Sequence, residues 1–147
     1  MTVRELMQTQ VFAVGPNDPL DRVYFLLHYE KIRHLPVLQK DKVIGMVSDR
    51  DLYKSLGPKS GKGPVQPGIN PAALHVSPRK VRHIMRRGVL TIEPQAAAAE
   101  AAAMMAKKKI GALPVVDHGK LVGILTATDL LGAFARLDSK AEQSRPA

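Results

Sequence analysis

The stretch KVIGMVSDRDL at Lys42–Leu52 recurs as KLVGILTATDL at Lys120–Leu130, 78 residues further along the chain. In each copy an apolar run ends at a hydroxyl residue, which is followed three positions later by an aspartate. The apolar run predicts a buried strand, and the hydroxyl residue predicts the start of a helix. The chain therefore contains the same strand-to-helix junction twice.

Two further segments repeat at the same offset. VRELM at Val3–Met7 recurs as VRHIM at Val81–Met85, and KIRHLPV at Lys31–Val37 recurs as KIGALPV at Lys109–Val115. Fourteen positions within residues 3–52 are identical to their partners 78 residues later, with no insertion between the segments. The chain is thus two copies of one structural repeat.

Each copy is expected to fold as a β-α-β-β-α unit preceded by a turn of helix, which gives an α+β fold class. The apolar spacing of Leu20, Val23, Tyr24 and Leu27 predicts a helix with one buried face. A unit of this length buries little surface alone, so the two copies are expected to pack on each other. The expected strands are 11–14, 34–38 and 43–47 in the first copy, and 89–92, 112–116 and 121–125 in the second.

The repeat and the composition together divide the chain into four segments. Residues 1–56 form the first unit, and residues 80–137 form the second. Residues 57–79 are rich in proline and glycine and are expected to be a basic linker. Residues 138–147 are expected to be a flexible tail.

The net charge of +9 is concentrated in the middle of the chain. Residues 52–92 hold eight basic residues and no acidic residue. Such a patch attracts nucleic acid or an acidic partner. A solvated linker kept soluble by lysine and arginine would have the same composition.

Several function classes are disfavoured by composition. The absence of cysteine excludes disulfides and thiolate chemistry, and it fits a cytoplasmic location. No apolar run suits a membrane span. We find no nucleophile–base set and no metal-ligand spacing, so we expect neither an enzyme nor a required cofactor. The histidines outside the repeated motifs are expected to be surface or packing residues.

The hydroxyl-x-x-aspartate junctions allow two interpretations. Ser48 with Asp51, and Thr126 with Asp129, are close variants of a helix capping box, which needs no ligand. The same groups also suit a nucleotide, because a carboxylate can accept hydrogen bonds from both hydroxyls of a ribose. Arg50 would add a guanidinium fork for phosphate oxygens in the first copy.

The repeated pattern V-x-x-[LI]-M, K-I-x-x-L-P-V and G-h-h-[ST]-x-x-D-L, where h is apolar, resembles the cystathionine-β-synthase (CBS) domain. Two copies in tandem resemble a CBS pair, or Bateman module, over residues 2–56 and 80–137. The resemblance implies two CBS units packed through their sheets about a pseudo-twofold axis. It also implies clefts that hold AMP, ADP, ATP or S-adenosylmethionine.

The resemblance implies a role for each motif position. In the family the hydroxyl residue and the aspartate contact phosphate and ribose. The residue before the aspartate often reaches phosphate, and the residue after the glycine lines the base pocket. The implied nucleotide-binding residues are Ser48, Arg50, Asp51 and Met46 in the first copy, and Thr126, Thr128, Asp129 and Ile124 in the second.

The two residues before L-P are often basic in the family and reach the phosphates of the neighbouring cleft. Here they are Arg33 and His34 in the first copy, which could equally be an exposed turn before a strand. In the second copy they are Gly111 and Ala112, which depart from the pattern. We therefore expect the two sites to bind with unequal affinities.

The resemblance favours a stand-alone regulatory module that binds an adenosyl ligand and signals to a separate effector protein. It also implies a disc-shaped homodimer formed by the exposed helix faces. The alternative hypothesis is a nucleic-acid-binding or partner-binding protein that acts through the basic segment 54–87, with the CBS pair as its scaffold.

Overall fold

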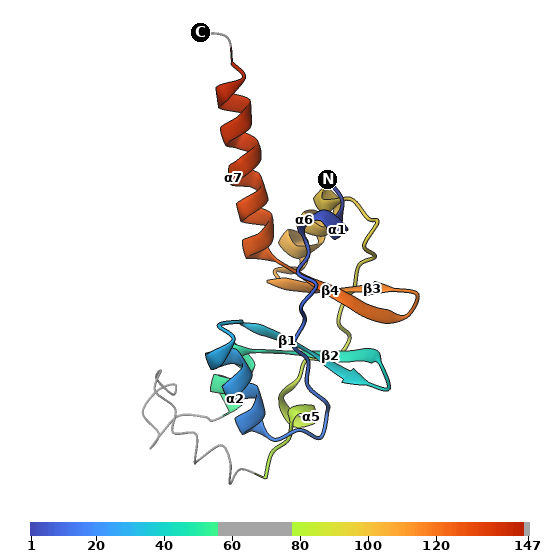
Figure 1. Cartoon of the computed structure of the whole chain (residues 1–147). Helices are drawn as coiled ribbons and strands as arrows, with labels where there is room; N and C mark the ends of the chain where they lie inside the picture. Colours follow the sequence, from blue (N-terminus) through green and yellow to red (C-terminus); the bar gives the residue numbers. More distant parts are fainter. Residues whose placement is uncertain (56–77, 146–147) are drawn as a thin grey trace. The chain divides into compact units, whose positions relative to one another are not determined.

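The computed structural model describes residues 1–55 and 78–145 (Figure 1). Helices and two small antiparallel sheets are mixed along the chain, which confirms the predicted α+β class. All but the last two residues of the predicted linker at 57–79 lie outside the described residues. No helix in the described part of the chain is long and apolar enough to cross a membrane.

The chain divides into two compact units that differ from the two sequence repeats. Residues Phe12–Val89 form one, here called the central unit, and residues Met1–Val11 with Leu90–Ala147 form the other, here called the terminal unit. Each repeat therefore contributes its first segment to the unit built from the other repeat. The units expected at 1–56 and 80–137 differ from this division in their leading segments.

Both predicted hairpins are present. In the central unit β1 (His34–Gln39) pairs with β2 (Lys42–Ser48), and in the terminal unit β3 (Ala112–Asp117) pairs with β4 (Lys120–Thr126). Each hairpin turns over two residues with positive φ, so the turn matches the twist of its strands.

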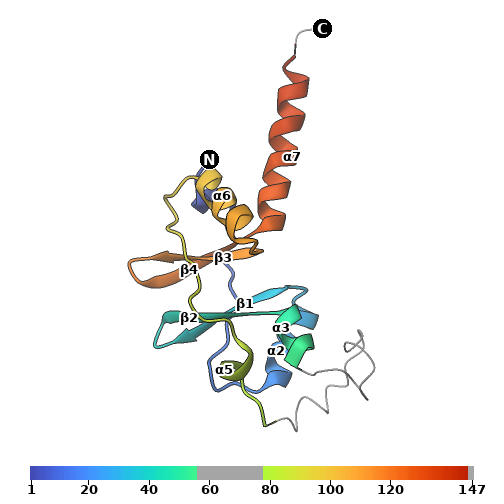
Figure 2. The same cartoon turned by 180° about the vertical axis from the view of Figure 1, so that it is seen from behind.

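Among the described residues, three helices accompany each sheet. Figure 2 shows α3 beside α2 in the central unit, and both views place α1 beside α6 in the terminal unit. The helices are α2 (Leu20–Tyr29), α3 (Asp49–Ser55) and α5 (Val81–Ile84) in the central unit, and α1 (Val3–Leu6), α6 (Ala98–Lys108) and α7 (Ala127–Gln143) in the terminal unit.

Helix α7 is longer than predicted. It continues to Gln143, through most of the segment expected to be a flexible tail at 138–147. From Phe134 onwards its residues are exposed, and Figure 1 shows this half of the helix running clear of α6 and the sheet. The alanine, lysine and glutamate of this segment favour continuation of the helix.

The predicted strands at 11–14 and 89–92 reduce to one bridging residue each. Val14 forms a parallel bridge with Val37, through Val14 N–H to the Pro36 carbonyl at 3.0 Å and Leu38 N–H to the Val14 carbonyl at 2.8 Å. If this bridge extended by one step in either direction, the hydrogen-bond donors would be the backbone nitrogens of Pro36 and Pro16, which carry no hydrogen. The terminal unit repeats the arrangement, so prolines confine each bridge to a single residue.

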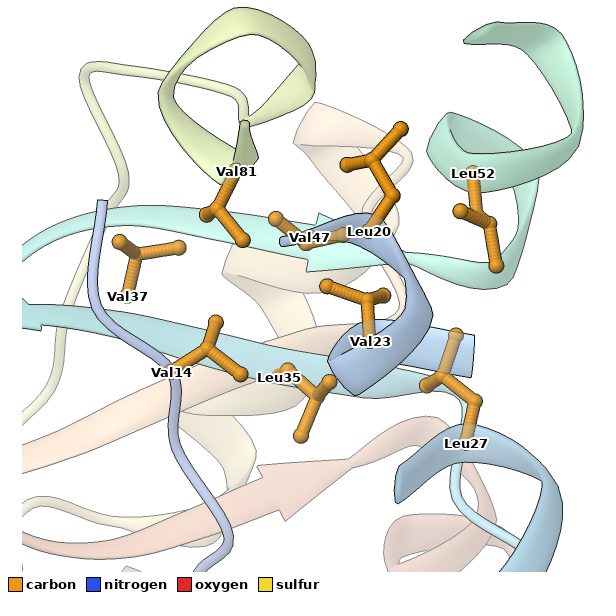
Figure 3. Close-up of a cluster of buried hydrophobic side chains, with 9 residues drawn as sticks. All are labelled: Val14, Leu20, Val23, Leu27, Leu35, Val37, Val47, Leu52 and Val81. Atoms are coloured by element: carbon orange, nitrogen blue, oxygen red, sulfur yellow. The ribbon is translucent and has the colours of Figure 1, made fainter. Parts of the chain in front are cut away.

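Each unit has its own buried core. In the central unit Leu20, Val23 and Leu27 of α2 pack over the sheet, as their spacing predicts (Figure 3). Val81 of α5 completes this core and is fully buried, although it belongs to the second repeat. Its counterpart Val3 of α1 is fully buried in the core of the terminal unit. Burial of these two valines anchors the leading segment of each repeat in the unit of the other repeat. These segments, residues 1–11 and 81–89, are here called the exchanged segments.

The exchanged segments also pair with the sheet edges. Arg86 and Met46 exchange backbone hydrogen bonds of 2.8 and 3.0 Å, and Gln8 and Ile124 exchange two of 2.9 Å. A Cβ atom on Gly45 would lie 2.9 Å from the Arg86 carbonyl oxygen, and one on Gly123 would lie 2.9 Å from that of Gln8. The repeated glycine is therefore required for close approach of the exchanged backbone.

Candidate functional site

Ser48 and Asp51 bind each other where β2 runs into α3. One carboxylate oxygen of Asp51, Oδ2, accepts from the Ser48 backbone N–H at 2.9 Å and from the Ser48 hydroxyl at 3.0 Å. The Ser48 hydroxyl in turn accepts from the Asp51 N–H at 3.2 Å. This reciprocal pattern confirms the capping interpretation of the first motif.

Thr126 and Asp129 repeat this geometry between β4 and α7. Asp129 Oδ2 accepts from the Thr126 N–H and from the Thr126 hydroxyl, both at 2.9 Å. The Thr126 hydroxyl accepts from the Asp129 N–H at 3.3 Å. Both aspartates are thus held in fixed orientations by their own helix ends.

The second carboxylate oxygen contacts the exchanged segment in each unit. Arg86 Nε donates to Asp51 Oδ1 at 3.2 Å, and Gln8 Nε2 donates to Asp129 Oδ1 at 3.0 Å. Arg86 and Gln8 are equivalent positions, because each directly follows the repeated V-x-x-[IL]-M segment. Asp51 is 9% exposed and its partner Arg86 is 64% exposed. The carboxylate is therefore fixed, while its outer partner extends into solvent.

More charged groups gather around Asp51. Arg33 Nε lies 3.3 Å from Asp49 Oδ2, and His34 is the strand partner of Ser48. Burial lowers the pKa of the His34 imidazole, against the opposing effect of the Asp49 carboxylate. The structure thus brings Arg33, His34 and Ser48 to one end of the β1–β2 hairpin.

The remaining predicted residues differ in exposure. Arg50 and Thr128 are exposed at the first turn of α3 and α7. Met46 and Ile124 are buried, and their backbone groups bind the exchanged segments. The assignment of these residues to nucleotide binding stays a prediction.

The terminal unit lacks most of this charge. Its site retains the aspartate and the hydroxyl residue but replaces the surrounding arginines and Asp49 with uncharged residues. The positions equivalent to Arg33, His34, Asp49 and Arg50 are Gly111, Ala112, Ala127 and Thr128.

Sequence reasoning missed Arg86 and Gln8 as the residues that bind the two aspartates. Arg86 was counted only as part of the basic segment 54–87, and Gln8 carried no motif. Their equivalence at the offset of 78 residues was the available signal, since each follows an identical methionine.

Three arginines of the basic segment 54–87 form hydrogen bonds or ion pairs within the central unit. Arg79 donates to the Ser55 carbonyl at 2.8 Å, Arg82 binds the Asn17 side chain, and Arg86 pairs with Asp51. Lys59 and Lys62 lie outside the described residues. Removing this whole set of charges would therefore also disturb the Asp51 site.

Comparison with known proteins places the chain in a family. The CBS domain model matches residues 3–57 and 81–136. A CBS domain-containing protein of Dictyostelium discoideum is 33% identical over 138 residues, which cover 92% of each chain. The chain belongs to the CBS domain family and carries two CBS domains in tandem.

Solved structures of CBS pairs share the fold. The CBS-pair protein CBSX2 from Arabidopsis thaliana is 28% identical with a TM-score of 0.75, over 94% of this chain and 96% of that chain. CBSX2 in complex with AMP is 26% identical with a TM-score of 0.72, over 93% and 98%. The CBS pair of protein MJ0100, solved with 5′-methylthioadenosine and S-adenosyl-L-methionine, is 22% identical with a TM-score of 0.75, over 92% and 97%.

Proposed function

We propose that the chain is a regulatory CBS pair that binds adenosine derivatives at two clusters and signals their presence to an effector protein. The Asp51 cluster is Ser48, Asp51 and Arg86, and the Asp129 cluster is Thr126, Asp129 and Gln8. Membership of the CBS family and the AMP complex of CBSX2 support an adenine-type ligand. The proposal assigns the chain a regulatory function rather than catalysis.

The observation that carries this proposal is the orientation of the two aspartates. In each cluster one oxygen is fixed by the helix cap, and the other accepts from an exposed side chain. The hydroxyls of a ribose are donors that could take the place of that side chain on Oδ1. One carboxylate can then cap its helix and bind a ribose at the same time.

Isothermal titration calorimetry tests the binding. We expect adenosine to bind two sites per chain and 2′-deoxyadenosine to bind about tenfold more weakly, because one ribose donor is lost. AMP, ADP, ATP and S-adenosylmethionine titrated at low and high salt then rank the ligands. Binding that survives high salt separates these sites from phosphate-backbone binding by the segment 54–87.

Asparagine substitutions test which residues carry the sites. Asp51→Asn and Asp129→Asn should each reduce adenosine binding from two sites per chain to one. Asp18→Asn is the matched control, since Asp18 also orders a turn, through the Gly15 N–H at 2.8 Å, but lies outside both clusters. If both site variants bind adenosine like the native protein, the aspartates only cap helices.

We also propose that two copies associate through exposed apolar helix faces. Phe25 and Tyr29 of α2 are exposed, as are Leu131, Phe134 and Leu137 of α7. Apolar surface of this kind favours a twofold interface. Light scattering at micromolar concentration should give the mass of a dimer, and the mass of a monomer would contradict the proposal.

A further inference from the structure

The two candidate sites differ in the residue that donates a hydrogen bond to Oδ1 of the aspartate. Arg86 and Gln8 occupy equivalent positions, and each donates a side-chain hydrogen bond to Oδ1 of its aspartate. The arginine brings a full positive charge to Asp51, whereas the glutamine brings none to Asp129. The same structural position therefore carries a different charge in each unit.

We propose that this position selects ligand charge: Arg86 directs the central unit to a phosphate-bearing adenosine, and Gln8 directs the terminal unit to an adenosine derivative without phosphate. The inference rests on the proposed function, because it concerns the ligands of those same two sites.

The first argument is the exchange of partners on binding. A ribose that takes over Asp51 Oδ1 displaces Arg86 from its carboxylate, which costs a charge-assisted hydrogen bond. A phosphate on the same ligand offers the guanidinium a new anionic partner, and its planar fork suits phosphate oxygens. A ligand without phosphate offers no such replacement. At Asp129 the ribose displaces only a neutral amide, so a phosphate is not needed.

The geometry of Arg86 fits this role. It reaches Asp51 through Nε, and its side chain makes no other hydrogen bond among the described residues. The two terminal nitrogens, which form the fork that pairs with phosphate, remain available to a ligand. The side chain is 64% exposed, so it can turn from the carboxylate to a bound phosphate.

The second argument is the charge around each aspartate. In the central unit the motif positions hold three arginines and two carboxylates, and in the terminal unit the equivalent positions hold one carboxylate and no basic residue. A phosphate is therefore attracted to the first site and repelled by the second, and a cationic group is favoured at the second. The charged residues are Arg33, Arg50, Arg86, Asp49 and Asp51 in the central unit, and Asp129 in the terminal unit.

Reciprocal substitutions test the inference, with AMP and adenosine as the probes in calorimetry. Arg86→Gln should lower the preference for AMP over adenosine about tenfold, the value expected for one charge-assisted hydrogen bond, because adenosine would then displace only a neutral amide and AMP would lose its guanidinium partner. Gln8→Arg should add a second AMP site per chain. Arg86→Gln installs the glutamine–aspartate pair that the terminal unit already contains, so the fold should tolerate it.

Arg22→Gln is the matched control for loss of positive charge. Arg22 lies in the same unit, has a similar exposure of 57% and pairs with Asp18 at 3.3 Å, away from Asp51. If Arg86→Gln changes the preference for AMP over adenosine no more than Arg22→Gln does, while adenosine still fills two sites, the inference is wrong and the proposed function stands. If the native protein binds neither adenosine nor AMP, the proposed function fails and the inference fails with it.

Discussion

In Asp51 and in Asp129, the two oxygens of one carboxylate accept hydrogen bonds from two different parts of the chain. In each, Oδ2 takes both the backbone N–H and the hydroxyl of the residue three positions earlier. This leaves Oδ1 directed to the exchanged segment, where Arg86 or Gln8 binds it. The capping and ligand-binding interpretations of the motif are therefore compatible, because they use different oxygens.

His34 predicts a pH dependence at the residue scale. Its folded-state pKa lies below the usual value of 6.5, chiefly because burial disfavours the charged imidazole. Between the two pKa values the unfolded chain binds more protons, so the free energy of unfolding should fall as the pH drops below about 6.5. His34→Ala, which copies Ala112 of the second repeat, should remove this part of the pH dependence.

Urea unfolding at pH values between about 5.5 and 7.5, where histidine is the side chain that normally titrates, measures this effect. His28→Ala, at an exposed position on α2, is the matched histidine deletion. Equal pH dependence in the native protein and in His34→Ala would refute the assignment.

At the scale of elements, each sheet depends on a close backbone approach at one edge and on proline at the other. Gly45 lets the Met85–Arg86 segment lie against β2, with a Cβ-to-carbonyl distance that would be 2.9 Å for alanine. On the β1 edge Pro36 and Pro16 confine the Val14 bridge to one residue. Within residues 1–55 and 78–145, these features explain why each sheet contains two full strands with single-residue pairing at both edges.

Gly45→Ala should therefore destabilise the protein. The added methyl group would meet the Arg86 carbonyl, which cannot move without breaking its hydrogen bond to Met46. We expect a loss of about 1–3 kcal/mol in the free energy of unfolding, as for an overpacked core. Chemical denaturation measures this loss.

Gly132→Ala on α7 is the control for the same added atom. Its Cβ would meet the Arg136 side chain at an ordinary 3.5 Å, so this helical glycine should gain roughly 0.5–1 kcal/mol on substitution. Equal effects of the two substitutions would show that the approach at Gly45 is not tight.

At the scale of the whole molecule, the repeats exchange their leading segments. Val3 is buried with Leu113 and Leu125 of the second repeat, and Val81 is buried with Leu35 and Val47 of the first. The stability of each unit therefore depends on residues from both repeats.

Truncation of these valines should loosen the unit of the other repeat. Val3→Ala should increase hydrogen exchange in β3 and β4, and Val81→Ala should increase it in β1 and β2, each with a loss of roughly 1–3 kcal/mol for the lost burial. Hydrogen-exchange mass spectrometry distinguishes the two hairpins. Faster exchange in the hairpin of the variant's own repeat would contradict the exchange of segments.

The sequence by itself determined the local structure of this protein. The hairpins follow from apolar runs around short polar turns, and the helix starts after Ser48 and Thr126 follow from a hydroxyl and an aspartate three residues apart. These signals are readable because the interacting groups are neighbours in the chain. The sequence did not predict that residues 11–14 pair with the sheet through Val14 alone. Pro36 limits this pairing only because Val14 lies beside Val37, and that register is set by the folded structure.

The tertiary structure alone decided which segment joins which unit and which residue binds the free oxygen of each aspartate. Val3 and Val81 are identical, as are Met7 and Met85, so the composition of these segments does not indicate which core each one joins. Arg86 reaches an aspartate 35 residues away, and Gln8 reaches one 121 residues away. Contacts at such separations arise from packing of the whole unit, which brings Arg86 to one aspartate and Gln8 to the other.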